Sequence, residues 1–169
     1  MDNKRVLYFA EGECETKLVS ALKEQPSLIR QGKVKKFNVI DEELKRSVLM
    51  TFPPGSIVIL VFDTDVEITK ILKRNLKLLS EFCKEVKVLT IPQGLNFENE
   101  IERSTDVKRA QDLTKSKSVS EFKTAVNRMK PVEFRNTLNR HSFDIKKMWI
   151  ERPPKSFDFI NQDADRIKL

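Results

Sequence analysis

The sequence predicts an α/β fold, with a parallel sheet of about four strands flanked by helices and a small helical C-terminal part. Two short apolar runs without alternation, at 6–10 and 57–62, are typical of strands buried on both faces of a sheet. Between such runs, apolar residues recur at spacings of three and four, which indicates helices. This alternation of strands and helices is a series of βαβ units, and it predicts a parallel sheet.

The chain opens with a predicted strand at 4–10 and continues into a helix. Leu18 and Leu22 repeat the four-residue spacing of a buried helix face. The helix should stop before Pro26, because the residue that precedes a proline is disfavoured in the α conformation. Gly12 lacks a side chain at the point where the backbone must turn from strand to helix.

Two shorter elements precede the central strand. Residues 34–40 alternate between apolar and polar side chains, which predicts a strand near the edge of the sheet. Residues 42–50 can form a short helix, and the Pro-Pro-Gly sequence at 53–55 indicates a turn. The central strand at 57–62 follows directly.

After the central strand, the apolar period becomes that of a long helix. Its predicted inner face consists of Ile68, Ile71, Leu72, Leu76 and Leu79. Residues 86–91 are apolar enough for a fourth strand, which Pro92 closes.

Only helices are predicted beyond residue 96. Residues 99–109 are expected to be helical, and the Ser-Val-Ser-Glu sequence at 118–121 is a capping box that opens a helix. Pro131 suits the first turn of another helix. Asp144 is expected to cap a last helix, which ends at Pro153-Pro154.

The charge divides the chain into two expected parts. Residues 1–100, the α/β domain, carry 16 Lys and Arg against 15 Asp and Glu, whereas residues 101–169, a basic extension packed on it, carry 16 against 10. A basic part beside acidic motifs suits a metal site that acts on a polyanion, although solvated helix faces would give the same pattern. The residues expected to contact nucleic acid are Lys108, Arg109, Arg128, Arg135, Arg140, Lys146 and Lys147.

Composition excludes several classes of protein. The longest apolar run has six residues, which is too short to cross a membrane. The sequence has no glycine-rich phosphate loop. Cys14, Cys83 and the single histidine, His141, are too few for a zinc module. Reduced thiols therefore predict a cytoplasmic protein.

Acidic residues follow the strands that should be neighbours in the middle of the sheet. Glu11 follows the first strand, and Asp63 and Asp65 follow the central one. In parallel sheets the carboxyl ends of the strands share one edge, where chemistry is usually located. The Asp-x-Asp sequence is also compatible with a simple turn that caps a helix.

Three further carboxylates are expected near this edge. Glu15 lies one helical turn beyond Glu11, and Glu98 and Glu100 follow the fourth strand. Oxygen ligands without histidine or cysteine are those that Mg²⁺ or Mn²⁺ prefers. Two such ions about 4 Å apart can activate a water and stabilise the leaving oxygen in phosphodiester cleavage.

A strand ending in Glu-Gly-x-x-Glu, followed by a strand ending in Asp-x-Asp, resembles the Toprim family over residues 4–100. The sequence Glu-Gly-Glu-Cys-Glu at 11–15 is most similar to OLD-type and RloB-like nucleases. The resemblance implies that Glu11, Asp63 and Asp65 are catalytic and bind metal. It also implies that Glu15 approaches the metals, with Glu98 or Glu100 as a further ligand.

Departures from the family narrow the expected function. The only tyrosine, Tyr8, falls within a predicted buried strand, which argues against a topoisomerase nucleophile. Without a zinc module or a Walker sequence, a primase or a fused ATPase is also not expected. The prediction is a Mg²⁺- or Mn²⁺-dependent endonuclease acting on DNA or RNA, with a separately encoded ATPase subunit in a larger assembly as a candidate partner.

Two alternatives remain open from sequence. The chain could be a non-catalytic, Toprim-like module that binds nucleic acid or regulates another protein. It could also be a phosphoacceptor receiver domain, because Asp63 would end the third strand there too. That fold requires a fifth strand, which the sequence does not predict.

Overall fold

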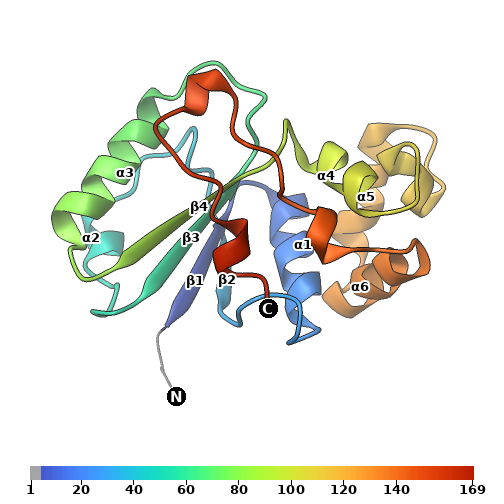
Figure 1. The fold of residues 1–169 in the computed structure, drawn as a ribbon, viewed down its shortest axis with the longest axis horizontal. Coiled ribbons are helices and arrows are strands. Elements are labelled where there is room, and N and C mark those ends of the chain that lie inside the picture. Colours follow the sequence, from blue (N-terminus) through green and yellow to red (C-terminus); the bar gives the residue numbers. More distant parts are fainter. Residues whose placement is uncertain (1–4) are drawn as a thin grey trace.

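The centre of the molecule is a four-stranded parallel sheet in the order β2-β1-β3-β4 (Figure 1). The computed structural model describes residues 5–169; Lys4, where the first strand was expected to begin, lies outside them. The strands are β1 (Val6–Ala10), β2 (Lys33–Lys36), β3 (Ile57–Phe62) and β4 (Lys87–Pro92). The predicted α/β class is therefore confirmed, and β1 and β3 are the central pair.

Helices cover both faces of the sheet. Figure 1 shows α1 (Glu13–Lys23) on one side and the α2 (Arg46–Leu49) and α3 (Lys70–Phe82) helices on the other. The later α-helices, α4 (Phe97–Ser104), α5 (Val119–Arg128) and α6 (Pro131–Arg140), lie on the α1 side. Short 3₁₀ helices are η1 (Ala110–Thr114), η2 (Ile145–Lys147), η3 (Lys155–Phe157) and η4 (Ala164–Arg166).

Each face of the sheet contributes to its own hydrophobic core. Alternate residues of β3 point to opposite sides, so that Ile59 packs with α1 and the later helices, whereas Leu60 packs with α2 and α3. The first core also takes in Phe122 and Phe134 from beyond residue 101. Because all six residues of β3 are buried, the central strand is fixed by packing on both faces.

The C-terminal segment runs along the outer edge of β4 (Figure 1). The amide of Asp163 donates to the carbonyl of Thr90 at 2.9 Å, and the Asp163 carboxylate accepts from the Thr90 amide at 3.0 Å. Further on, Ile29 and Lys168 form an isolated antiparallel bridge. The bonds to Thr90 pair backbone groups of β4 that would otherwise be exposed at a sheet edge.

The elements between α1 and β3 are shorter than predicted. The strand predicted at 34–40 ends at Lys36, and the helix predicted at 42–50 covers only Arg46–Leu49. The buried side chain of Asn75 explains the difference, because its carbonyl accepts from the Leu44 amide and its amide donates to the Val39 and Glu42 carbonyls. These side-chain bonds replace strand and helix bonds in this segment.

Three predictions for later helices are also wrong. Ile68 precedes α3 and is 78% exposed rather than part of its inner face. The helix predicted at 99–109 is α4, which ends at Ser104. The last predicted helix is only the turn Ile145–Lys147, because Trp149 takes a positive φ of 55° that a helix cannot continue through.

Two classes of fold feature are not found within residues 5–169. None of their helices is long and apolar enough to cross a membrane. Their sheet stops at four strands, so the described part of the chain does not provide the fifth strand of a receiver domain.

Candidate functional site

The carboxyl ends of β1 and β3 bring Glu11 and Asp63 together. Ala10 pairs with Val61 in the parallel register, so the residues that leave the two strands emerge side by side. The Glu11 amide donates to the Val61 carbonyl at 3.0 Å. The Asp63 amide in turn donates to Glu11 Oε2 at 2.7 Å. The centre of the sheet therefore holds these two acidic residues in direct contact.

Glu15 is turned back toward the same edge by the first turn of α1. Its side chain lies over Gly12, where an added Cβ would be 2.6 Å from Glu15 Oε2. Only glycine leaves this space, so the Gly-x-x-Glu spacing has a steric reason. The Glu15 side chain is buried, with a residue exposure of 7%.

These three carboxyl groups have unusually high pKa values. Burial raises the pKa of Glu11 to about 7, and the charge of Glu15 adds to the rise, although the hydrogen bond from Asp63 opposes it. Burial raises the pKa of Asp63 to about 8, with further increases from the charges of Glu15 and Glu11. Burial also raises the pKa of Glu15. Burial is the main cause in all three groups, and the charge of Glu15 adds to the rise at both Glu11 and Asp63.

Asp65 and Glu98 lie at the margin of this group. Asp65 is exposed, yet its charge raises the pKa of both Glu11 and Asp63. Glu98 is buried, and its Oε1 lies 2.8 Å from Lys123 Nζ. The charge of Glu98 also raises the pKa of Glu15. Both residues thus belong to the electrostatic surroundings of the central carboxylates.

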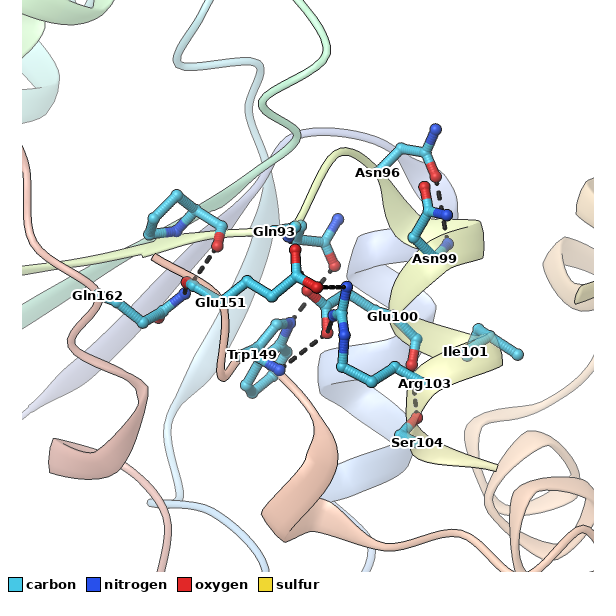
Figure 2. Close-up of polar contacts among 12 residues, drawn as sticks. Gln93, Asn96, Asn99, Glu100, Ile101, Arg103, Ser104, Trp149, Glu151 and Gln162 are labelled. Atoms are coloured by element: carbon cyan, nitrogen blue, oxygen red, sulfur yellow. Dashed lines mark hydrogen bonds and ion pairs between the residues drawn. The ribbon is translucent and has the colours of Figure 1, made fainter. Parts of the chain in front are cut away.

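Glu100 is engaged in contacts of a different kind. Its Oε1 accepts from the Gly94 amide at 2.7 Å and its Oε2 from the Trp149 amide at 2.8 Å. Arg103 completes this environment with an ion pair at 2.9 Å (Figure 2). Because both oxygens accept from backbone amides, Glu100 holds the segments around Gly94 and Trp149 in place.

Two residues at the site were not predicted from the sequence. Gln93 follows β4 and donates from Nε2 to Asp63 Oδ1; its place after a strand was a usable signal, but its side chain is neutral. Lys123 reaches Glu98 from α5. Although burial acts in the opposite direction, the hydrogen bond and charge of Glu98 raise the pKa of Lys123. The packing of α5 against α1 and η1 brings it here.

The donor chemistry of the site fits a hard divalent cation. Glu11, Glu15 and Asp63 offer only carboxylate oxygens. Burial is the main cause of their raised pKa values, and a bound cation would offset the cost of the buried charge. Within residues 5–169, however, the side chains as oriented form no group of three acidic, histidine or cysteine residues that could hold a metal. Glu11 Oε2, for example, faces the Asp63 amide. Binding would therefore require side-chain rotation at a preformed backbone.

The basic residues expected to contact nucleic acid are spread over several elements after α4. Arg109 pairs with Asp112 at 2.7 Å, and Arg140 donates to Thr137 at 3.0 Å. Arg135 is half-buried and donates to Asn136. The remaining four, Lys108, Arg128, Lys146 and Lys147, are all exposed, and Arg128 is the last residue of α5.

The fold and the site together define an α/β protein with a carboxylate cluster at the carboxyl edge of its parallel sheet. Comparison with protein families, with curated proteins and with solved structures found no match.

Proposed function

We propose that this chain is a Mg²⁺- or Mn²⁺-dependent nuclease of the Toprim type. The observation that carries the proposal is the contact between Glu11 and Asp63 at adjacent strand ends, with Glu15 turned toward them. Carboxyl groups whose pKa values are raised by burial and by neighbouring charges are typical of functional sites, because keeping such charges close together is costly unless a ligand compensates them. This arrangement supports the resemblance suggested by the two motifs.

In the proposed site, the acidic residues have different roles. Glu11, Glu15 and Asp63 would hold the cations. Asp65 and Glu98 would add negative charge close to these three ligands. The cations, when bound, would lower the pKa of an attacking water and stabilise the leaving oxygen. Glu100 is left out of the ligand set because its oxygens hold Gly94 and Trp149.

The proposed substrate is the phosphodiester backbone of DNA or RNA. Exposed basic residues such as Lys108, Lys146 and Lys147 would hold the strand through its phosphates. We extend the proposal to a cytoplasmic setting, because both cysteines are free thiols, and to a separately encoded ATPase subunit as a partner.

A second candidate is a Toprim-like module that binds nucleic acid without cutting it. One observation favours it: within residues 5–169 the Glu11 carboxylate accepts from the Asp63 amide, and the acidic side chains as oriented form no group of three that could hold a metal. Such a module would bind nucleic acid with a steep salt dependence but would show no cleavage with either metal.

Cleavage assays decide between the two candidates. Labelled single- and double-stranded DNA and RNA would be incubated with Mg²⁺ or Mn²⁺ and with wild-type protein, Asp63→Ala or Glu67→Ala. Glu67 is an exposed carboxylate in the same loop, so its variant controls for the loss of one charge. The nuclease predicts cutting by wild type and Glu67→Ala but not by Asp63→Ala. Equal cutting by wild type and Asp63→Ala, or cutting by neither, would overturn it.

A further inference from the structure

A buried chain of polar contacts links Asp63 to the segment after α6. Gln93 Nε2 donates to Asp63 Oδ1, and Gln93 Oε1 accepts from the indole Nε1–H of Trp149 at 3.4 Å. Gln93 and Trp149 are each only 1% exposed. Figure 2 shows Trp149, Glu100 and Arg103 gathered beside Gln93.

The indole determines which way the Gln93 amide faces. A side-chain amide offers both a donor and an acceptor, whereas an indole N–H can only donate. The group that faces Trp149 must therefore be Oε1, which leaves the donor Nε2 facing Asp63. As a consequence, one oxygen of Asp63 accepts from a neutral donor, and the other oxygen is left for a cation.

Trp149 is itself held in a conformation that needs support. Its φ of 55° lies in the left-handed region, which is unfavourable for a bulky residue. Its amide donates to Glu100 Oε2, and Glu100 is anchored by Arg103, which also pairs with Glu151 at 2.7 Å. Leu95, two residues after Gln93, has a φ of 66°, and its carbonyl accepts from the Thr64 amide at 2.7 Å. Strained residues that the surroundings hold in place are typical of functional sites.

We propose that Gln93 is a positioning residue that orients the Asp63 carboxylate for cation binding, and that Trp149 fixes the direction of its amide. This inference rests on the proposed function. It means that the site is completed by a residue from beyond position 101, which neither acidic motif contains. Partners that orient metal ligands in this way commonly change metal affinity or activity by about 10–100-fold when removed.

Two variants separate the contacts, and one glutamine provides a matched control. Gln93→Met keeps the side-chain length but removes the donor to Asp63. Trp149→Phe keeps an aromatic ring but removes the indole N–H. Gln162 also supports the end of β4, since its Nε2 donates to the Pro92 and Glu151 carbonyls (Figure 2), but it makes no bond to Asp63. Gln162→Met therefore repeats the same chemical change without touching the carboxylate.

The test is a titration of the full chain with Mn²⁺, in which the electron paramagnetic resonance signal of the unbound ion measures the dissociation constant. Thermal unfolding establishes that each variant is folded. We expect Gln93→Met to raise the Mn²⁺ dissociation constant by about 10–100-fold, Trp149→Phe to raise it by less, and Gln162→Met to leave it unchanged. Cleavage at saturating Mn²⁺ should show a lower kcat for Gln93→Met with an unchanged KM, because the nucleic-acid contacts are intact.

The possible failures can be told apart. Wild-type protein that binds no Mn²⁺ would overturn the proposed function and this inference with it. Wild-type binding that Gln93→Met and Trp149→Phe both retain would overturn the positioning role alone. Equal weakening by Gln93→Met and Gln162→Met would also overturn it, because the effect would then come from packing at the end of β4. If Gln93→Met does not fold, an unchanged dissociation constant in folded Trp149→Phe overturns the role.

Discussion

The Glu15 carboxylate occupies the space where position 12 would carry a side chain, with Oε2 only 2.6 Å from an added Cβ. Gly12 has φ −126° and ψ −173°, which any residue can adopt, so glycine is needed here for space and not for backbone freedom. This relationship ties the first acidic motif to the position of Glu15 and allows that position to be changed without removing a charge.

Gly12→Ala should therefore displace the Glu15 carboxylate while leaving the fold intact. The contact involves the end of a flexible side chain, so we expect little change in the free energy of unfolding. We expect metal-dependent cleavage to fall by about tenfold or more, in the range seen when metal surroundings are disturbed. Unfolding in denaturant and initial cleavage rates check the two parts. Unchanged cleavage by a folded Gly12→Ala protein would show that Glu15 has no role at the metals.

Charge reversal in the basic extension should weaken nucleic-acid binding without regard to sequence. Lys146 and Lys147 are exposed, so Lys146→Glu with Lys147→Glu should not disturb packing. Affinity should fall, and the salt dependence should flatten by roughly one unit of slope for each phosphate group that the variant no longer binds. Titration of one labelled oligonucleotide at several salt concentrations measures both.

The matched control for this double variant is Lys84→Glu with Lys87→Glu. These exposed lysines lie at the amino end of β4. The carboxylates follow the carboxyl ends of the strands, at the other end of the sheet. Their reversal changes the net charge equally but should alter binding less. If both double variants behave alike, the nucleic-acid surface is not located at Lys146 and Lys147.

The raised pKa values predict how stability depends on pH in the absence of metal. The pKa of Asp63 rises from its ordinary value of 3.8 to about 8, because burial and neighbouring carboxylates disfavour its charged form. The folded state then holds a proton that the unfolded state has released, so the stability contribution is present below about pH 4 and is lost as pH rises toward 8. Asp63→Asn, which cannot ionise, should show a smaller decline over this window.

Denaturant unfolding in a chelator between pH 4 and 8.5 checks this prediction, with Asp158→Asn as the control at an exposed carboxylate. Parallel curves for wild type and Asp63→Asn would mean that Asp63 ionises normally and that the carboxylates do not repel one another.

The central strands and their acidic ends could be predicted because their signals are local. An apolar run without alternation requires burial on both faces, and Glu11 and Asp63 follow such runs directly. The segment around Trp149 and Asp163 could not be predicted, because its conformation depends on bonds to Glu100 and Thr90 far away in the sequence. A pattern of periodicity contains no information on such distant partners.

The candidate site shows the same division between local and distant signals. Charge at a strand end identified the carboxylates, and the structure distinguishes Glu98 from Glu100 by the Gly94 and Trp149 amides that occupy Glu100. Gln93 was missed because a neutral amide after a strand differs little from any loop residue. Lys123 was missed because its position depends on how α5 packs against α1.

The most direct test of the account is the melting temperature of the protein with and without divalent metal. A ligand that binds only the folded state stabilises it by about 2.7 kcal/mol at one hundred times its dissociation constant. We expect millimolar Mg²⁺ or Mn²⁺ to raise the melting temperature of wild type and of Glu67→Ala, and Asp63→Asn to lose most of that rise. An unchanged melting temperature with either metal, or an equal rise in Asp63→Asn, would contradict a shared metal site at Glu11, Glu15 and Asp63.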